Sequence, residues 1–204
     1  MILLVASTSF AAPWGMKTGT PALKSAGPLA FGPDGVLFVG DTKSATIFAI
    51  DTGDSDGDPS EVELHVLDLG QKIAQLIEQD TQDVTINDLA INPQSGNAYV
   101  SVAYGEQGKP AIFQILPNGE INPIVLKDID FSKVVLPNPP EDRVTGQGRR
   151  RRNLRDQSIT DIAFSDGRLL VSGLSSDDTS SNVREILFPF EDADRGTSLE
   201  IFHG

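Results

Sequence analysis

The stretch GPLAFGPDGVLFVGDTKSATIFAID, residues 27–51, decides the predicted fold. Two apolar runs flank a Pro-Asp-Gly turn, and a third apolar run follows Asp41-Thr42-Lys43. Glycine supplies the positive φ angle that a tight hairpin needs, because it has no Cβ atom to clash. The stretch therefore predicts three short antiparallel strands joined by turns.

The same arrangement occurs twice more, in residues 86–121 and 159–192. The first strands of the three units read Leu-Ala-Phe, Leu-Ala-Ile and Ile-Ala-Phe, and each is followed by a turn that contains glycine. A small residue at the centre of each first strand suits a radial array, in which the innermost strands crowd around the axis. Repeated units of this kind predict an all-β fold, a partial β-propeller of about three four-stranded antiparallel blades.

We place the blades at about residues 27–68, 86–127 and 159–204, within a propeller region of 12–204. The fourth, outer strands are expected over residues 61–67 and 121–126 and from residue 199, since polar and apolar residues alternate in the first of these. Insertions at 69–85 and 128–158 separate the blades. In the first, Ile73, Leu76 and Ile77 have helical spacing, which predicts a short helix that covers apolar surface or forms a lid over the channel.

The segment LAFGPDGVLFVGDTKSATIFAID resembles an NHL repeat, in which an apolar strand, a Pro-Asp-Gly turn and two further strands follow one another. Units two and three depart from the pattern after their second strand, where Ala103-Tyr104 and Leu174-Ser175 replace Asp41-Thr42. The resemblance implies propeller architecture and leaves the function open, because propellers have many unrelated activities. Propellers close with four to eight blades, so three blades predict a portion of a longer propeller or a ring completed by other copies.

Composition narrows the classes of partner. The formal net charge of -13 disfavours nucleic acid, whose phosphates an acidic surface repels. The chain has no cysteine, which excludes disulfides and thiolate ligands. No stretch approaches the roughly 20 apolar residues of a membrane-spanning helix.

The first residues, MILLVASTSFAAP, resemble the end of a secretory signal peptide, because a short apolar run precedes small residues. We interpret residues 1–11 as a signal peptide remnant and expect a secreted or periplasmic protein. A buried N-terminal strand is the alternative.

Asp88 and Asp161 directly precede the first strands of their units, a position that lies at the mouth of the channel in a propeller. Together with Asn87 they could ligate a hard cation such as Ca²⁺. In this respect the chain resembles gluconolactonase-like propellers, which hold a catalytic metal with acidic and amide side chains near these strand starts. Asn87-Asp88-Leu89 lacks the glycine of their motif. The alternative is that each aspartate caps a turn through its side-chain oxygen.

Two further segments carry concentrated charge. Asp54, Asp56 and Asp58 alternate like the start of a calcium loop, but Pro59 stands where the turn glycine is needed. The second segment contains five arginines, which are Arg149, Arg150, Arg151, Arg152 and Arg155. It is interpreted as an anion- or partner-binding site or as a solvated loop, and it lacks the interleaved aromatics of nucleic-acid sites.

The hypothesis from sequence is an exported, non-catalytic scaffold that binds a protein, a glycan or a small ligand. A metal-dependent hydrolase or lactonase with its metal at the channel mouth is the alternative, and a quinoprotein-type oxidoreductase has the least support. His65 and His203 have no Ser or Asp partner at a recognisable spacing, and no nucleophile-elbow motif occurs.

Overall fold

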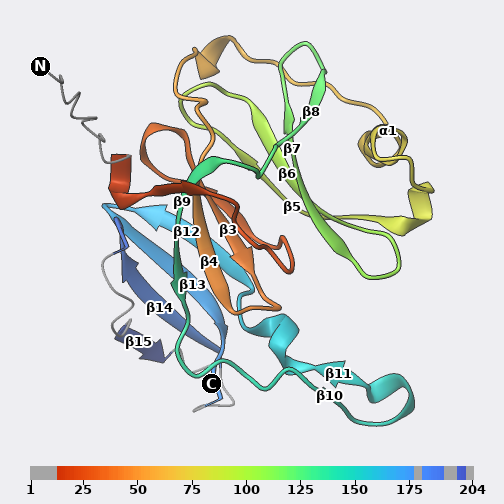
Figure 1. Ribbon diagram of the computed structural model, residues 1–204, viewed down its shortest axis with the longest axis vertical. Helices are drawn as coiled ribbons and strands as arrows, with labels where there is room; N and C mark the ends of the chain where they lie inside the picture. The colour runs from red at the N-terminus through yellow and green to blue at the C-terminus, as the bar shows by residue number, and fades with distance from the viewer. Residues whose placement is uncertain (1–12, 177–180, 191–196, 201–204) are drawn as a thin grey trace, which may run out of the picture.

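The computed structural model describes residues 13–176, 181–190 and 197–200. The described chain is an all-β partial propeller of three antiparallel sheets, which we call the first, second and third blades (Figure 1). Within the described residues, no helix is long and apolar enough to cross a membrane.

The first blade has the strand order β1-β9-β4-β3-β2. Its strands are β1 (Lys17–Gly19), β2 (Leu29–Phe31), β3 (Val36–Asp41), β4 (Thr46–Asp51) and β9 (Ile129–Val135). The second blade contains β5 (Val84–Ile91), β6 (Ala98–Tyr104), β7 (Lys109–Ile115) and β8 (Ile121–Pro123). The third contains β12 (Asp161–Ser165), β13 (Arg168–Leu174), β14 (Ser181–Leu187) and β15 (Thr197–Glu200).

A separate two-stranded hairpin consists of β10 (Val144–Thr145) and β11 (Arg152–Asn153). The α-helix is α1 (Leu69–Leu76). Short 3-10 turns occupy Pro13–Gly15, Pro33–Gly35, Pro59–Glu61, Thr81–Asp83, Gly148–Arg150 and Leu154–Gln157.

The predicted hairpin turns are confirmed. Asp34 and Gly35 have φ angles of 51° and 74°, and the equivalent Asp166 and Gly167 have 49° and 77°. A Cβ atom at residue 35 would lie 2.3 Å from the backbone oxygen of Asp54, so this turn also needs glycine for close packing.

The turn after β3 is fixed by Asp41, the buried last residue of that strand. Its carboxylate accepts hydrogen bonds from the backbone N–H groups of Lys24, Ser25 and Ser44 and from the Ser25 hydroxyl. A buried charge is tolerated where hydrogen bonds replace its hydration, and here they tie the segment before β2 to the β3–β4 turn.

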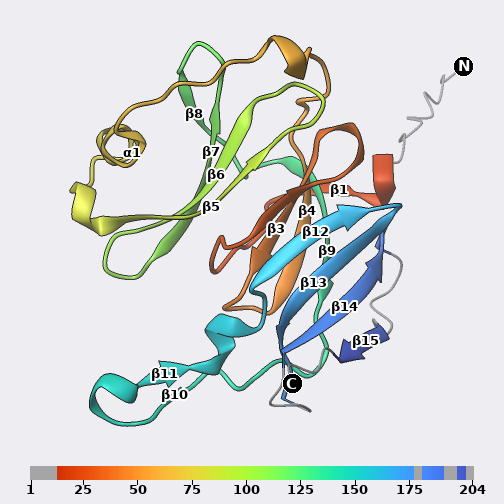
Figure 2. The same cartoon turned by 180° about the vertical axis from the view of Figure 1, so that it is seen from behind.

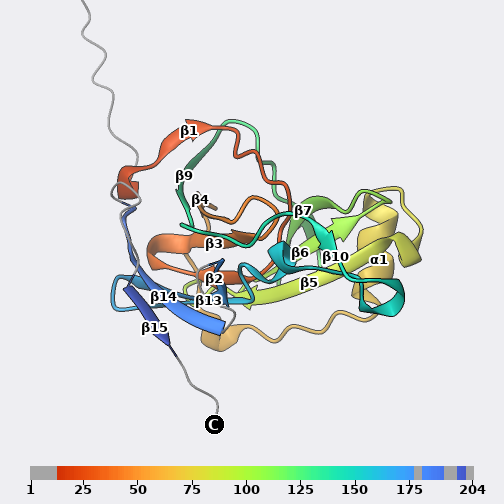
Figure 3. The ribbon, with the colours of Figure 1, turned by 90° about the horizontal axis from the view of Figure 1, so that it is seen from below.

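The first blade lies between the other two, as Figures 2 and 3 show from behind and below. Its innermost strand β2 contacts both β5 and β12. One apolar cluster, with Phe38 and Ile47 at its centre, joins the first blade to the third. Another, with Leu37 and Tyr99, joins it to the second. The spatial order is therefore second, first, third, and it differs from the order along the chain.

The prediction of an outer strand over residues 61–67 is wrong, because that segment forms no strand after the turn Pro59–Glu61. The first blade instead takes β9 from the insertion 128–158, and β9 pairs antiparallel with β4 and with β1. Leu64 and Val66, whose spacing predicted a strand, pack against the apolar cluster of the second blade.

The predicted helix is confirmed as α1, and it covers the flank of the second blade that faces away from the first. Ile73 is buried among Val100, Val102 and Phe113 of that blade. The helix is thus an apolar cap. Its packing agrees with the interpretation as a cover and not with a lid over a channel.

Candidate functional site

Asp88 and Asn87, two of the predicted metal ligands, both bond to the first blade. An Asp88 carboxylate oxygen accepts a hydrogen bond from the Leu29 backbone N–H at 2.8 Å. The Asn87 side-chain amide donates to the Ala26 backbone oxygen at 2.7 Å. These contacts join two blades and are not the local turn caps of the alternative interpretation. Asp88 lies within β5, so the prediction that it precedes the first strand of its unit is wrong.

Asp161 has a different environment. Its carboxylate accepts from the backbone N–H of Ile162 at 2.9 Å, and its side chain is exposed on β12 of the third blade. Over residues 13–176, 181–190 and 197–200, no group of three or more histidine, cysteine, aspartate or glutamate side chains is placed to hold a metal ion. A metal on Asp88, Asp161 and Asn87 stays a prediction.

Asp54, the first aspartate of the predicted calcium loop, lies instead in a polar cluster between the first and second blades. Its carboxylate accepts hydrogen bonds from the side chains of Ser95 (2.8 Å), Asn97 (3.0 and 3.1 Å), Tyr99 (2.9 Å) and Gln114 (3.2 Å). The backbone oxygen of Asp54 accepts from the Asn92 amide at 2.6 Å. We call these six residues the Asp54 cluster.

The Asp54 cluster stabilises the ionised carboxylate. Burial raises the pKa of Asp54, but the hydrogen bonds led by those of Asn97 and Ser95 outweigh it, so the net pKa lies below the usual value. Burial raises the pKa of Tyr99, and the nearby charge of Asp54 adds to this, so the Tyr99 hydroxyl stays protonated and donates. The Asp54 cluster therefore holds the first and second blades together through hydrogen bonds.

Asp58 also has an internal role. It caps the turn Pro59–Glu61 by accepting from the backbone N–H and the hydroxyl of Ser60, and these bonds lower the pKa of Asp58. Asp54 points into the blade interface while Asp58 caps its own turn. Calcium binding by Asp54, Asp56 and Asp58 together stays a prediction.

The predicted arginine segment forms the hairpin β10–β11, which projects away from the three blades in Figures 1 and 2. Arg149, Arg150 and Arg151 lie in its turn and are exposed. Gly146 allows this turn, since it has a φ of 84° and a Cβ there would lie 2.3 Å from the Arg150 backbone oxygen.

The base of the hairpin is held by internal hydrogen bonds. The Arg155 side chain donates through Nε to the Pro140 backbone oxygen at 2.6 Å, and the Asn153 amide donates to Asp142 at 2.7 Å. Arg143 pairs with Glu141 at 2.9 Å. For the guanidinium groups of Arg149, Arg150, Arg151 and Arg152, by contrast, the described part of the chain offers no ion pair or hydrogen bond.

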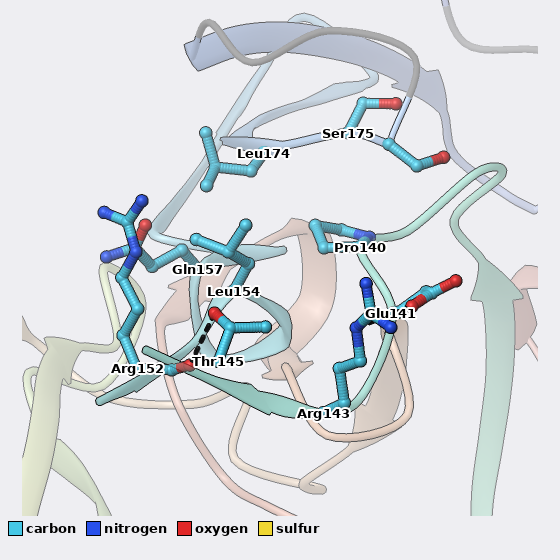
Figure 4. Close-up of a pocket in the computed structure, with 10 residues that line it drawn as sticks. Pro140, Glu141, Arg143, Thr145, Arg152, Leu154, Gln157, Leu174 and Ser175 are labelled. Atoms are coloured by element: carbon cyan, nitrogen blue, oxygen red, sulfur yellow. Dashed lines mark hydrogen bonds and ion pairs between the residues drawn. The ribbon is translucent and has the colours of Figure 1, made fainter. Parts of the chain in front are cut away.

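A cavity of about 470 Å³ lies between the hairpin and the end of β13. It is lined by Pro140, Glu141, Arg143, Thr145, Arg152, Leu154, Gln157, Leu174, Ser175 and Ser176. In Figure 4, Arg152 and Gln157 lie on one side and Arg143 with Glu141 on the other, while Leu154 lies between them. The cavity combines apolar surface with the unpaired cation of Arg152 on one side and the Arg143–Glu141 ion pair on the other, and we call it the hairpin pocket.

Sequence reasoning found Arg152 but missed the rest of the hairpin pocket. Leu174 and Ser175 belong to the third blade, and only folding brings them beside Pro140 and Leu154. The unusual length of the insertion 128–158 was the available signal, because long insertions in compact domains are often functional.

No protein-family model and no curated protein matches the chain. Among solved structures, the PQQ-bound aldose sugar dehydrogenase from Streptomyces coelicolor is similar at 14% identity and a TM-score of 0.28, over 92% of this chain and 86% of that one.

Proposed function

We propose that this protein is a non-catalytic binding module that uses the arginine hairpin to bind an acidic protein partner. The observation that carries the proposal is the concentration of cations in and beside one projecting hairpin of an acidic chain, where Arg149, Arg150, Arg151 and Arg152 have no ion pair among the described residues. Six of the 16 Lys and Arg residues lie between residues 141 and 157, together with three acidic residues.

The electrostatics of the rest of the chain support this choice. With a formal net charge of -13, most of the surface repels an acidic partner at long range, so approach through the hairpin is favoured. An exposed guanidinium without an internal partner can form bidentate hydrogen bonds with a carboxylate. The projecting hairpin can therefore reach carboxylates on another protein.

The test is binding of a fluorescein-labelled hexaglutamate peptide to the full chain, followed by fluorescence anisotropy. We expect binding in about 0.01 M salt that weakens strongly in about 0.15 M salt, because the Debye length falls from about 30 Å to about 8 Å. Replacing Arg149, Arg150 and Arg151 together with Gln should weaken binding by about tenfold or more. An unchanged affinity would overturn the proposal.

A matched control replaces Lys17, Lys72 and Lys109, three exposed lysines on other elements, with Gln. This triple variant has the same change in net charge but keeps the hairpin. In the same low salt, its affinity for hexaglutamate should fall by less than that of the arginine variant, because the three lysines lie on β1, α1 and β7 and not in the hairpin.

The proposal retains three expectations from the sequence, which are export, the NHL type of the repeat and completion of the ring by further blades or other copies. Residues 1–12 lie outside the described residues, so export is best tested by sequencing the N-terminus of the protein recovered from cells and from medium. The mass in solution tests completion by other copies.

A further inference from the structure

We infer that the hairpin pocket receives an apolar side chain flanked by carboxylates, so that the partner is recognised through an acidic segment with an apolar anchor. This inference rests on the proposed function and specifies its ligand. It concerns the hairpin pocket at the base of the hairpin, where Arg152 lies beside apolar side chains.

The apolar part of the hairpin pocket comes from three elements distant in sequence. Pro140 precedes the hairpin, Leu154 follows it, and Leu174 ends β13 of the third blade. Leu154 and Leu174 are half-buried, so each keeps part of its surface towards the cavity. Covering such surface with a second apolar side chain is favourable, and the volume of about 470 Å³ lies within the range of ligand-binding pockets.

The cationic part of the pocket is unequal on its two sides. Arg143 is neutralised by Glu141, whereas Arg152 on the opposite side has no anionic partner among the described residues. The Thr145 hydroxyl donates to the Arg152 backbone oxygen at 3.3 Å, which fixes the strand that carries Arg152 and leaves its guanidinium untouched. A carboxylate beside the anchor can therefore pair with Arg152 while neighbouring carboxylates contact the hairpin turn.

The position of the pocket beside the exposed arginines favours a peptide over a small anion. Arg149, Arg150 and Arg151 lie outside the pocket lining, so a ligand confined to the cavity would leave them unused. An extended segment advances about 3.3 Å per residue, so a few residues on either side of an anchor can reach them. Anchoring one apolar residue in a pocket with a polar rim is a common form of hot-spot recognition.

The experiment compares three labelled peptides, Glu-Glu-Phe-Glu-Glu, Glu-Glu-Ser-Glu-Glu and Gln-Gln-Phe-Gln-Gln, on the full chain. We expect the acidic Phe peptide to bind about tenfold more tightly than the acidic Ser peptide, because the phenyl ring is buried in the pocket. The neutral Phe peptide should bind more weakly than both, since the arginines then have no carboxylates to contact.

Two variants localise the effect. Leu154→Ser should remove the preference for Phe over Ser while keeping affinity for the acidic Ser peptide. Arg152→Gln should weaken the acidic Phe peptide more than Arg149→Gln does, although both variants remove one charge. Circular dichroism and thermal melts of each variant check that it is folded, and the peptide comparison on the unmodified chain does not depend on them.

The outcomes separate the two proposals. Equal affinity for the two acidic peptides would overturn the inference about the pocket while leaving the arginine hairpin as the binding element. Equal affinity for the acidic and neutral Phe peptides would also overturn it. If neither acidic peptide binds even in low salt, the proposed function itself is wrong.

Discussion

Asp54 and Arg152 are both charged groups beside a blade, but their surroundings are opposite. The Asp54 carboxylate accepts hydrogen bonds from four side chains of the second blade. The Arg152 guanidinium lines a cavity and has no anionic partner among the described residues. A charge whose hydrogen bonds are satisfied within the protein stabilises the fold, whereas an unsatisfied exposed charge is available to an external ligand. Asp54 therefore stabilises the packing of two blades, whereas Arg152 is the group to which we attribute binding in our proposal.

The largest effect should come from Asp54→Ala, which leaves several donors of the Asp54 cluster without their acceptor. We expect the free energy of unfolding to fall by about 2–3 kcal/mol, because hydrogen bonds to a charged group are worth about 1.5–3 kcal/mol. Urea unfolding measures it. The exposed neighbour Asp56 supplies the control, and Asp56→Ala should change stability by less than about 0.5 kcal/mol. Equal losses of unfolding free energy in the two variants would contradict a structural role for the hydrogen bonds of Asp54.

Acid should weaken the stabilising contribution of Asp54. Because the pKa of Asp54 is lowered in the folded protein, its stabilising contribution is present above the unfolded pKa of about 4 and is lost as the pH falls through the lower folded pKa. Urea unfolding of the unmodified chain and of Asp54→Asn should therefore differ most near neutral pH, and the difference should shrink below about pH 4. A difference that grows on acidification would contradict the hydrogen-bonded carboxylate.

A smaller effect on stability is expected when the hairpin itself is distorted. Gly146→Ala places a Cβ against the Arg150 backbone oxygen at a positive φ, so the turn must rearrange. The hairpin projects from the blades, so global unfolding should change by less than about 1 kcal/mol while binding of the acidic Phe peptide weakens. The matched control is Gly119→Ala, at another positive-φ turn with no atom near the new Cβ, which should keep peptide binding. If Gly146→Ala instead unfolds the protein, the hairpin is not separable from the core.

The smallest effect should come from calcium. The oxygens of the Asp54 carboxylate already accept several hydrogen bonds, and Asp58 caps its own turn. Excess Ca²⁺ and then EDTA should therefore leave the melting temperature within about 1 °C, since only a ligand that prefers the folded state raises it. A clear rise that Asp54→Ala abolishes would support calcium binding by the loop that contains Asp54, Asp56 and Asp58.

Local features of this fold could be predicted from the sequence, and long-range pairings could not. The Asp-Gly turns and helix α1 follow from residues next to one another, through positive φ angles and helical spacing. The strand pattern of residues 61–67 was misleading, because Leu64 and Val66 pack on the second blade as an irregular cover. No local signal shows that β9 pairs with β4 across about 80 residues of chain.

The same limit applies to the candidate site. Asp54 was noticed for its spacing from Asp56 and Asp58, whereas its role comes from donors about 40–60 residues later in the chain. The run of four consecutive arginines draws attention to Arg152 in the sequence, but Leu174, which lines the same pocket, belongs to the third blade. In both cases the sequence shows the charged residue, but only the fold shows which side chains surround it.

The pairing of β9 with β4 also has a consequence for biosynthesis. During translation, β2, β3 and β4 emerge before the second blade, but the strand that completes their sheet emerges only after it. Until β9 is synthesised, the edge of β4 is therefore unpaired, and an unpaired edge strand is prone to aggregation or mispairing with other strands. Once residues 129–135 are synthesised, β9 can pair with β4 and complete the sheet of the first blade. By then all strands of the second blade have already been synthesised. The two blades should then become resistant to proteolysis together, and a nascent chain that ends before residue 129 should remain sensitive in its first blade.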